Sequence, residues 1–140
     1  MQDSDYAKTI LDVIPPTMRY IKNEMRNSAK SELTVPQFRL LAKLSRSLAT
    51  NNELAEWMGV SAPTMTRMVD SLVKRNLIKR TSEPADRRQV KLSLTDGGQT
   101  LYQKIHRAVH AKFTEKVAYL TAEKKKALTN GLNVLRELFL

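Results

Sequence analysis

The chain has 140 residues, of which 41% are hydrophobic, and its 24 basic and 14 acidic side chains give a net charge of +10. No apolar run approaches the roughly 20 residues of a membrane span and no signal or transit peptide is evident, so we expect one cytoplasmic domain covering residues 1–140. The lack of cysteine excludes disulfides and thiolate metal sites, and the positive charge favours a polyanionic partner.

The N-terminal segment, residues 3–29, has apolar side chains at helical spacing. Pro15 and Pro16 interrupt it, so either a single kinked helix forms, which we favour, or a second helix starts with proline in its first turn. Thr34 and Gln37 then have the spacing of a capping box, which predicts the start of the next helix. The expected buried stripe of that helix is Phe38, Leu41, Ala42 and Leu44.

Two short helices are predicted next. Residues 48–51 favour an extended segment, and Asn51 or Asn52 is expected to cap a helix that Gly59 ends. Ser61 is a suitable N-cap for the following helix, in which apolar side chains recur every three or four residues and leave the opposite face polar. The apolar positions are Met65, Met68, Val69, Leu72 and Val73.

A hairpin and two long helices complete the chain. Asn76 closes the preceding helix, and residues 78–81 and 90–94 have the pattern of two strands. Residues 95–98 are expected to start a helix running to about residue 120, and Thr121 to cap a last helix. The last helix carries a series of leucines at helical spacing, namely Leu128, Leu132, Leu135 and Leu138.

The order of elements predicts a mainly α fold with a small β-hairpin wing. Residues 33–98 would form a winged helix-turn-helix, flanked by helical dimerisation regions at residues 1–32 and 99–140. The flanking helices hold more apolar surface than a small winged module needs, which favours burial against a second copy of the chain. The alternative is a helical layer packed within one chain.

The central region has the features of a DNA reader. Two short helices joined by a three-residue turn allow the second to present its N-terminal half to the major groove, and arginines at a hairpin tip suit the minor groove. Residues 61–91 hold eight basic and three acidic side chains, half of the excess charge. A purely structural helix pair and a solvated loop are the alternatives. The candidate DNA-binding residues are Ser61, Pro63, Thr64, Thr66, Arg67, Ser71, Lys74, Arg80, Arg87 and Arg88.

The sequence resembles the MarR family of bacterial transcription regulators. The stretches that carry the resemblance are residues 34–38, 54–61, 64–72, 76–78, 86–88 and 94–95 with Gly98. The resemblance implies an obligate, roughly triangular homodimer whose first and last two helices intertwine. It also implies that two winged modules read a pseudopalindromic operator in double-stranded DNA, usually as a repressor released by a small ligand.

A pocket for a small aromatic ligand is expected where the first, second and fifth helices meet. Methionine side chains suit an adaptable apolar site, although the same residues at helical spacing also suit an ordinary core. The expected lining consists of Met18, Ile21, Met25, Phe38, Ile105 and His106.

His106 and His110 lie four residues apart and project from one helix face, as a pair of metal ligands would. The zinc-responsive subset of the MarR family has such a pair, with a further histidine where this chain has Arg39. A guanidinium cannot bind zinc, although Glu24 could still contribute a carboxylate. We therefore expect no metal and no cofactor, and interpret the histidines as surface or dimer-contact residues.

No nucleophile triad, paired-carboxylate site or glycine-rich phosphate loop is apparent, so we do not expect an enzyme. The favoured hypothesis is a sequence-specific regulator of transcription. The alternative is a basic architectural or RNA-associated protein of low specificity, for which the net charge alone would suffice.

Overall fold

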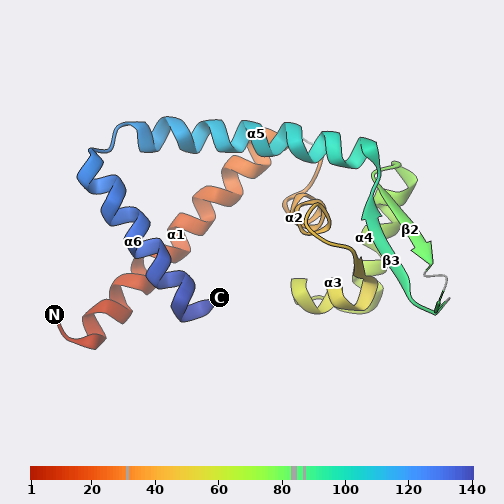
Figure 1. Cartoon of the computed structure of the whole chain (residues 1–140), viewed down its shortest axis with the longest axis horizontal. Coiled ribbons are helices and arrows are strands. Elements are labelled where there is room, and N and C mark those ends of the chain that lie inside the picture. The colour runs from red at the N-terminus through yellow and green to blue at the C-terminus, as the bar shows by residue number, and fades with distance from the viewer. Residues whose placement is uncertain (31, 83–84, 87) are drawn as a thin grey trace.

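The structure is a computed structural model that describes residues 1–30, 32–82, 85–86 and 88–140. It confirms a mainly helical fold with a small antiparallel sheet (Figure 1). Among the described residues the elements are α1 (Asp3–Ala29), α2 (Val35–Leu44), β1 (Ala49–Thr50), α3 (Asn51–Met58), α4 (Ala62–Lys74), β2 (Ile78–Ser82), β3 (Val90–Leu94), α5 (Asp96–Ala118) and α6 (Ala122–Phe139).

The predicted hairpin is confirmed and gains a third strand. β3 lies in the centre of the sheet, between β2 and the short β1. Arg80 of β2 pairs with Leu92 of β3, and Ala49 of β1 pairs with Leu92 from the other side. The segment that the sequence predicted only as extended therefore links the start of the helix-turn-helix to the middle of β3.

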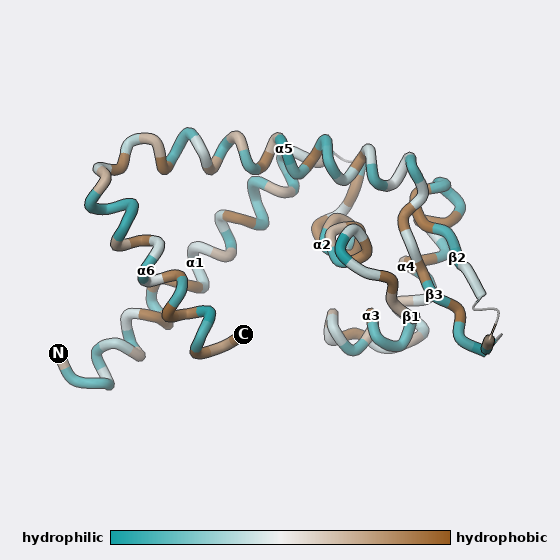
Figure 2. The backbone as a smooth tube through the Cα atoms, in the orientation of Figure 1, coloured by the Kyte–Doolittle hydropathy of each residue, from teal (hydrophilic) through white to brown (hydrophobic). Residues whose placement is uncertain are grey.

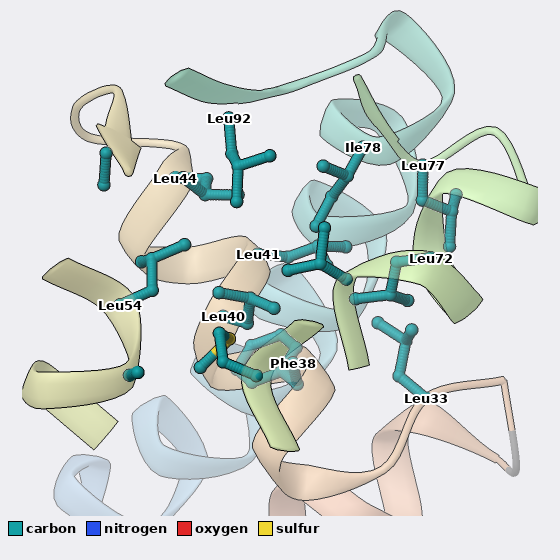
Figure 3. Close-up of a cluster of buried hydrophobic side chains, with 14 of the residues drawn as sticks. Leu33, Phe38, Leu40, Leu41, Leu44, Leu54, Leu72, Leu77, Ile78 and Leu92 are labelled. Atoms are coloured by element: carbon teal, nitrogen blue, oxygen red, sulfur yellow. The ribbon is translucent and has the colours of Figure 1, made fainter. Parts of the chain in front are cut away.

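The hydrophobic core surrounds α2, which lies below α5 and above α3 in Figure 1 and contacts both α5 and β3. Figure 3 shows the buried side chains of this core. Leu40 and Leu41 are completely buried there. The predicted stripe was wrong at two positions, because α2 is enclosed on several sides: Leu40 belongs to the core and Ala42 is only partly buried. Side chains from the surrounding elements complete the cluster, including Leu54, Met65, Val69, Leu72, Ile78, Leu92 and Ile105.

Side-chain caps start the helices. The predicted capping box of α2 is confirmed: the Gln37 amide donates to Thr34 Oγ1 at 3.2 Å, and the Thr34 amide donates to Gln37 Oε1 at 3.0 Å. Ser61 and Thr121 cap their helices as expected, and Thr95 caps α5. The expected asparagine cap of α3 was wrong, since Thr50 accepts from the Glu53 amide and the helix already begins at the next residue.

α1 runs unbroken through Pro15 and Pro16, which confirms a single helix. Each proline lacks an N–H group, so the carbonyl groups of Leu11 and Asp12 lose their helical donors. Only the last residue of α1, Ala29, is buried. Most of α1 therefore gains little from the core that surrounds α2.

α6 is the least covered helix. None of its residues, all of which the structure describes, is buried, and Leu138 and Phe139 are 62% and 67% exposed. Hydrophobic residues recur along α6 at the end of the molecule opposite the sheet (Figure 2). No helix in the described parts of the chain is long and apolar enough to cross a membrane.

The start of α5 is fixed against the end of α4. Asn76, in the left-handed region at φ 57°, ends the α4 turn, and its carbonyl accepts from Thr95 Oγ1 at 2.6 Å. Gly98, in the first turn of α5, lies directly against the backbone of Leu77. A Cβ atom at Gly98 would overlap the Leu77 carbonyl oxygen and lie 2.9 Å from its carbon. This close approach requires glycine.

We predict that Gly98→Ala lowers the free energy of unfolding by about 1–3 kcal/mol, because the added methyl group must push α5 away from Leu77. Gly97→Ala is the matched control, since its nearest contact would be an ordinary 3.5 Å to the Asn76 carbonyl. Urea denaturation of both variants measures the difference. Equal unfolding midpoints for the two would contradict the packing argument.

Candidate nucleic-acid interface

The helix-turn-helix is built from α3, a tight turn and α4. Gly59 takes the left-handed conformation at φ 74°, which ends α3 and turns the chain. Ser61 Oγ accepts from the Thr64 amide and starts α4. The Asn51 side chain donates to the Ala62 carbonyl at 3.3 Å and links the starts of the two helices.

α4 has one buried and one exposed face. Met65, Val69 and Leu72 are fully buried against the core, so the opposite side of the helix is directed to solvent. Seven of the candidate DNA-binding residues lie at its start and along this exposed side: Ser61, Pro63, Thr66, Arg67, Ser71 and Lys74 are exposed, and Thr64 is half-buried. The structure therefore brings them onto one surface.

Hydrogen bonds organise the N-terminal half of this face. Ser61 Oγ donates to Thr64 Oγ1 at 2.9 Å, and Arg67 Nη2 donates to the same hydroxyl at 3.4 Å. Thr66 instead directs its hydroxyl to the Ala62 carbonyl at 3.0 Å. The Arg67 guanidinium is thereby directed toward the start of α4, the end that a recognition helix presents to base edges.

The hairpin supplies a second basic surface beside α4. Arg88 is exposed, and the Asp86 carboxylate accepts from its backbone amide at 3.0 Å. The predicted contact residue Arg87 lies outside the described residues. Arg80 of β2 is exposed and forms an ion pair with Asp70 of α4. No pattern within α4 or β2 alone indicates this ion pair, because it joins two different elements.

Trp57 of α3 is covered by two cations, a contact that the sequence analysis did not anticipate. The Arg39 guanidinium lies 5.3 Å from the centre of the ring, and Lys43 Nζ lies 5.7 Å from it. Both cations come from α2. These cation–π contacts join α2 to the first helix of the helix-turn-helix.

A separate apolar groove of about 310 Å³ lies between α1, α2 and α5. Four of the predicted ligand residues line it, and three further side chains complete it. The lining residues are Ile21, Met25, Phe38, His106, Val109, His110 and Phe113. Met18 is 45% exposed and outside this lining, whereas Ile105 is fully buried in the core.

Aromatic rings follow one another along the α5 side of this groove. Tyr102 lies 5.6 Å from Phe38 and 5.5 Å from His106, and His106 stacks with His110 at 6.3 Å between ring centres. In the described parts of the chain no group of three or more metal-ligating side chains comes together. His106 and His110 belong to this line of ring contacts, in which the Phe38–Tyr102 and Tyr102–His106 pairs are tilted and the His106–His110 pair is stacked.

Comparison with known proteins gives consistent matches. The family model described as "MarR family" matches residues 33–90. An uncharacterized HTH-type transcriptional regulator of Mycobacterium leprae is 30% identical over 139 residues, covering 99% of this chain and 96% of the relative. The HTH-type transcriptional repressor MdtR of Bacillus subtilis is 34% identical, covering 74% of this chain and 68% of the repressor.

Solved structures agree in fold. The YusO protein of Bacillus subtilis matches with a TM-score of 0.72 and 28% identity, covering 98% of this chain and 99% of that one. Wild-type MarR of E. coli in its apo form matches with a TM-score of 0.76 and 23% identity, covering 92% and 95%. The similarity therefore includes the flanking helices as well as the central region.

Proposed function

The chain belongs to the MarR family of DNA-binding transcriptional regulators, and from this premise we propose that it is a homodimeric repressor that a small ligand releases from its operator. Like its relatives, it is a regulator of transcription and not an enzyme. The repressor named among those relatives supports the sign of regulation. We place its action in the cytoplasm, where a bacterial operator is accessible.

We propose that α4 enters the major groove and that the hairpin enters the adjacent minor groove. The exposed polar face of α4, opposite the buried Met65, Val69 and Leu72, is the observation that carries this proposal. Arg67 has the forked donors that suit guanine O6 and N7, and Thr64 and Thr66 can bond base edges or phosphates. Ser61, Pro63, Ser71, Lys74, Arg87 and Arg88 are proposed to contact the backbone or the minor groove, whereas Arg80, the remaining predicted contact, is paired with Asp70.

We assign residues 33–98 to DNA binding and residues 1–32 and 99–140 to dimerisation within one domain. Part of α1 is covered within the chain, as the edge-to-face contact of Tyr20 with Phe113 at 5.8 Å illustrates. Its N-terminal half and α6 remain uncovered, and Leu11 is 71% exposed. A second copy would cover this apolar surface and place two α4 helices on half-sites about 34 Å apart.

The apolar groove beside Phe38 and His106 is the proposed ligand site. Its volume of about 310 Å³ lies at the lower end of the range for small-molecule pockets and suits a compact aromatic ligand. The groove lies between α1 and α5 of the dimerisation region and α2 of the DNA-binding region. A ligand there would contact both regions and so alter their relative position.

Selection of bound sequences from a random duplex pool tests the function. We expect a pseudopalindromic sequence that binds at least about 10³-fold tighter than random DNA at equal salt. Enrichment of no sequence, with equal affinity for every duplex or for RNA, would favour the basic architectural protein instead.

Arg67→Ala is expected to weaken binding to the selected operator by about 1–3 kcal/mol while leaving binding to random duplex nearly unchanged, because a bidentate base contact is lost and phosphate contacts remain. Titration of both duplexes by fluorescence anisotropy measures the two affinities. Arg107→Ala removes an exposed arginine of α5 and is the control. Equal losses on both duplexes would make Arg67 a backbone contact.

Arg88→Ala is expected to weaken binding to all duplexes and to reduce the slope of log affinity against log salt by about one, because one cation near the DNA is removed. The slope is measured between 50 and about 200 mM salt. An unchanged slope and affinity would exclude Arg88 from the interface.

The double variant Leu132→Asp with Leu138→Asp is expected to convert a dimer into a monomer of 16.0 kDa, because both charges fall on the uncovered face of α6. Operator affinity should then fall by about 10²- to 10⁴-fold, because the two DNA-binding regions are no longer linked and binding at one half-site no longer favours binding at the other. Light scattering and DNA titration measure both effects, with Asn133→Asp as the control. A wild-type monomer, or a monomeric variant with full affinity, would exclude this mechanism.

A further inference from the structure

Asp70 is the only acidic residue of α4, and it lies on the face proposed to meet DNA. Arg67 precedes it by one turn and Lys74 follows it by one turn, so the carboxylate sits within an otherwise basic surface. A negative charge in this place repels phosphate groups. Its position therefore calls for a role other than attraction of DNA.

The register of the hairpin brings Arg80 to this carboxylate. Alternate residues of a strand share one face, so Arg80 lies on the same side of β2 as the buried Ile78. That side packs toward the core and α4, and the Arg80 guanidinium forms its ion pair with Asp70 there. The Asp70 and Arg80 side chains are 49% and 40% exposed, respectively, so the pair lies at the surface.

The pair changes which cations of this surface are available to DNA. The Arg67 guanidinium is directed toward Thr64 and away from the pair. The charge of Arg80, by contrast, is neutralised by Asp70, so the pair adds no net charge to the exposed face of α4. An exposed ion pair of this kind is weak, so the removal of Asp70 would release Arg80 without disturbing the core.

We propose that Asp70 is a specificity-determining residue, which withholds Arg80 from DNA phosphates and thereby weakens binding to nonspecific DNA. The inference rests on the proposed function of α4 and the hairpin. Nonspecific affinity depends on how many phosphates the protein neutralises, because each contact releases counterions. Base contacts by α4 fix its register on the operator, whereas nonspecific complexes are free to use any additional cation. Withholding one cation therefore acts mainly on nonspecific binding.

Asp70→Asn is expected to tighten binding to random duplex about two- to fivefold at 0.1 M salt, the range set by the strength of an exposed ion pair, and to steepen its salt slope by up to about 0.9, the effect of one added phosphate contact. Operator affinity should rise less, so that the ratio of specific to nonspecific affinity falls. Asp70→Ala, which cannot accept a hydrogen bond from Arg80, should behave in the same way. Glu115→Gln removes one negative charge from an exposed position of α5 and is the control for net charge.

A double-mutant cycle separates release of Arg80 from simple loss of a negative charge. Arg80→Gln alone should change nonspecific affinity less than twofold, and in the Asp70→Asn background it should remove most of the gain. A gain that persists without Arg80, no gain at all, or an equal gain on operator and random duplex would overturn the proposal. If Arg67→Ala and Arg88→Ala also leave all DNA binding unchanged, the proposed function itself fails.

Discussion

The packing of the core around α2 is the constraint on which the rest of the structure depends. Leu40 and Leu41 lie in the core, and α3, α4, the sheet and α5 each contribute buried side chains to it from one face. A helix packed in this way has only its opposite side left for solvent. The polar face of α4 is thus a consequence of how the core is filled, and its exposure does not depend on DNA.

The local features of the fold could be predicted from the sequence. Caps such as Thr34 with Gln37, or Ser61, act within one turn, and the spacing of apolar residues marks the buried side of a helix. The errors arose where contacts between segments distant in the sequence determine strand pairing or burial. The pairing of Ala49 with Leu92 depends on two segments more than 40 residues apart in the sequence, and the enclosure of Leu40 depends on all the elements around α2.

The candidate site likewise contains features that a local pattern predicts and contacts that form only between different elements. The exposed face of α4 follows from its periodicity, and the structure places the predicted residues of that helix together. The ion pair of Asp70 with Arg80 and the stacking of Arg39 on Trp57 join different elements, so no local pattern indicated them. The groove likewise gains Val109 and Phe113, because the crossing of α1 and α5 selects which side chains meet.

The contact of Gly98 with Leu77 has a mechanical consequence. α5 has 23 residues, so it is a rod about 35 Å long that is clamped at one end to the hairpin and continues at the other into α6. A tilt of about 5° at the clamped end displaces the far end by about 3 Å, by the geometry of a rod of this length. Because Gly98 has no side chain, α5 lies directly against Leu77, and a change in the tilt of α5 at this contact is transmitted along the helix to α6.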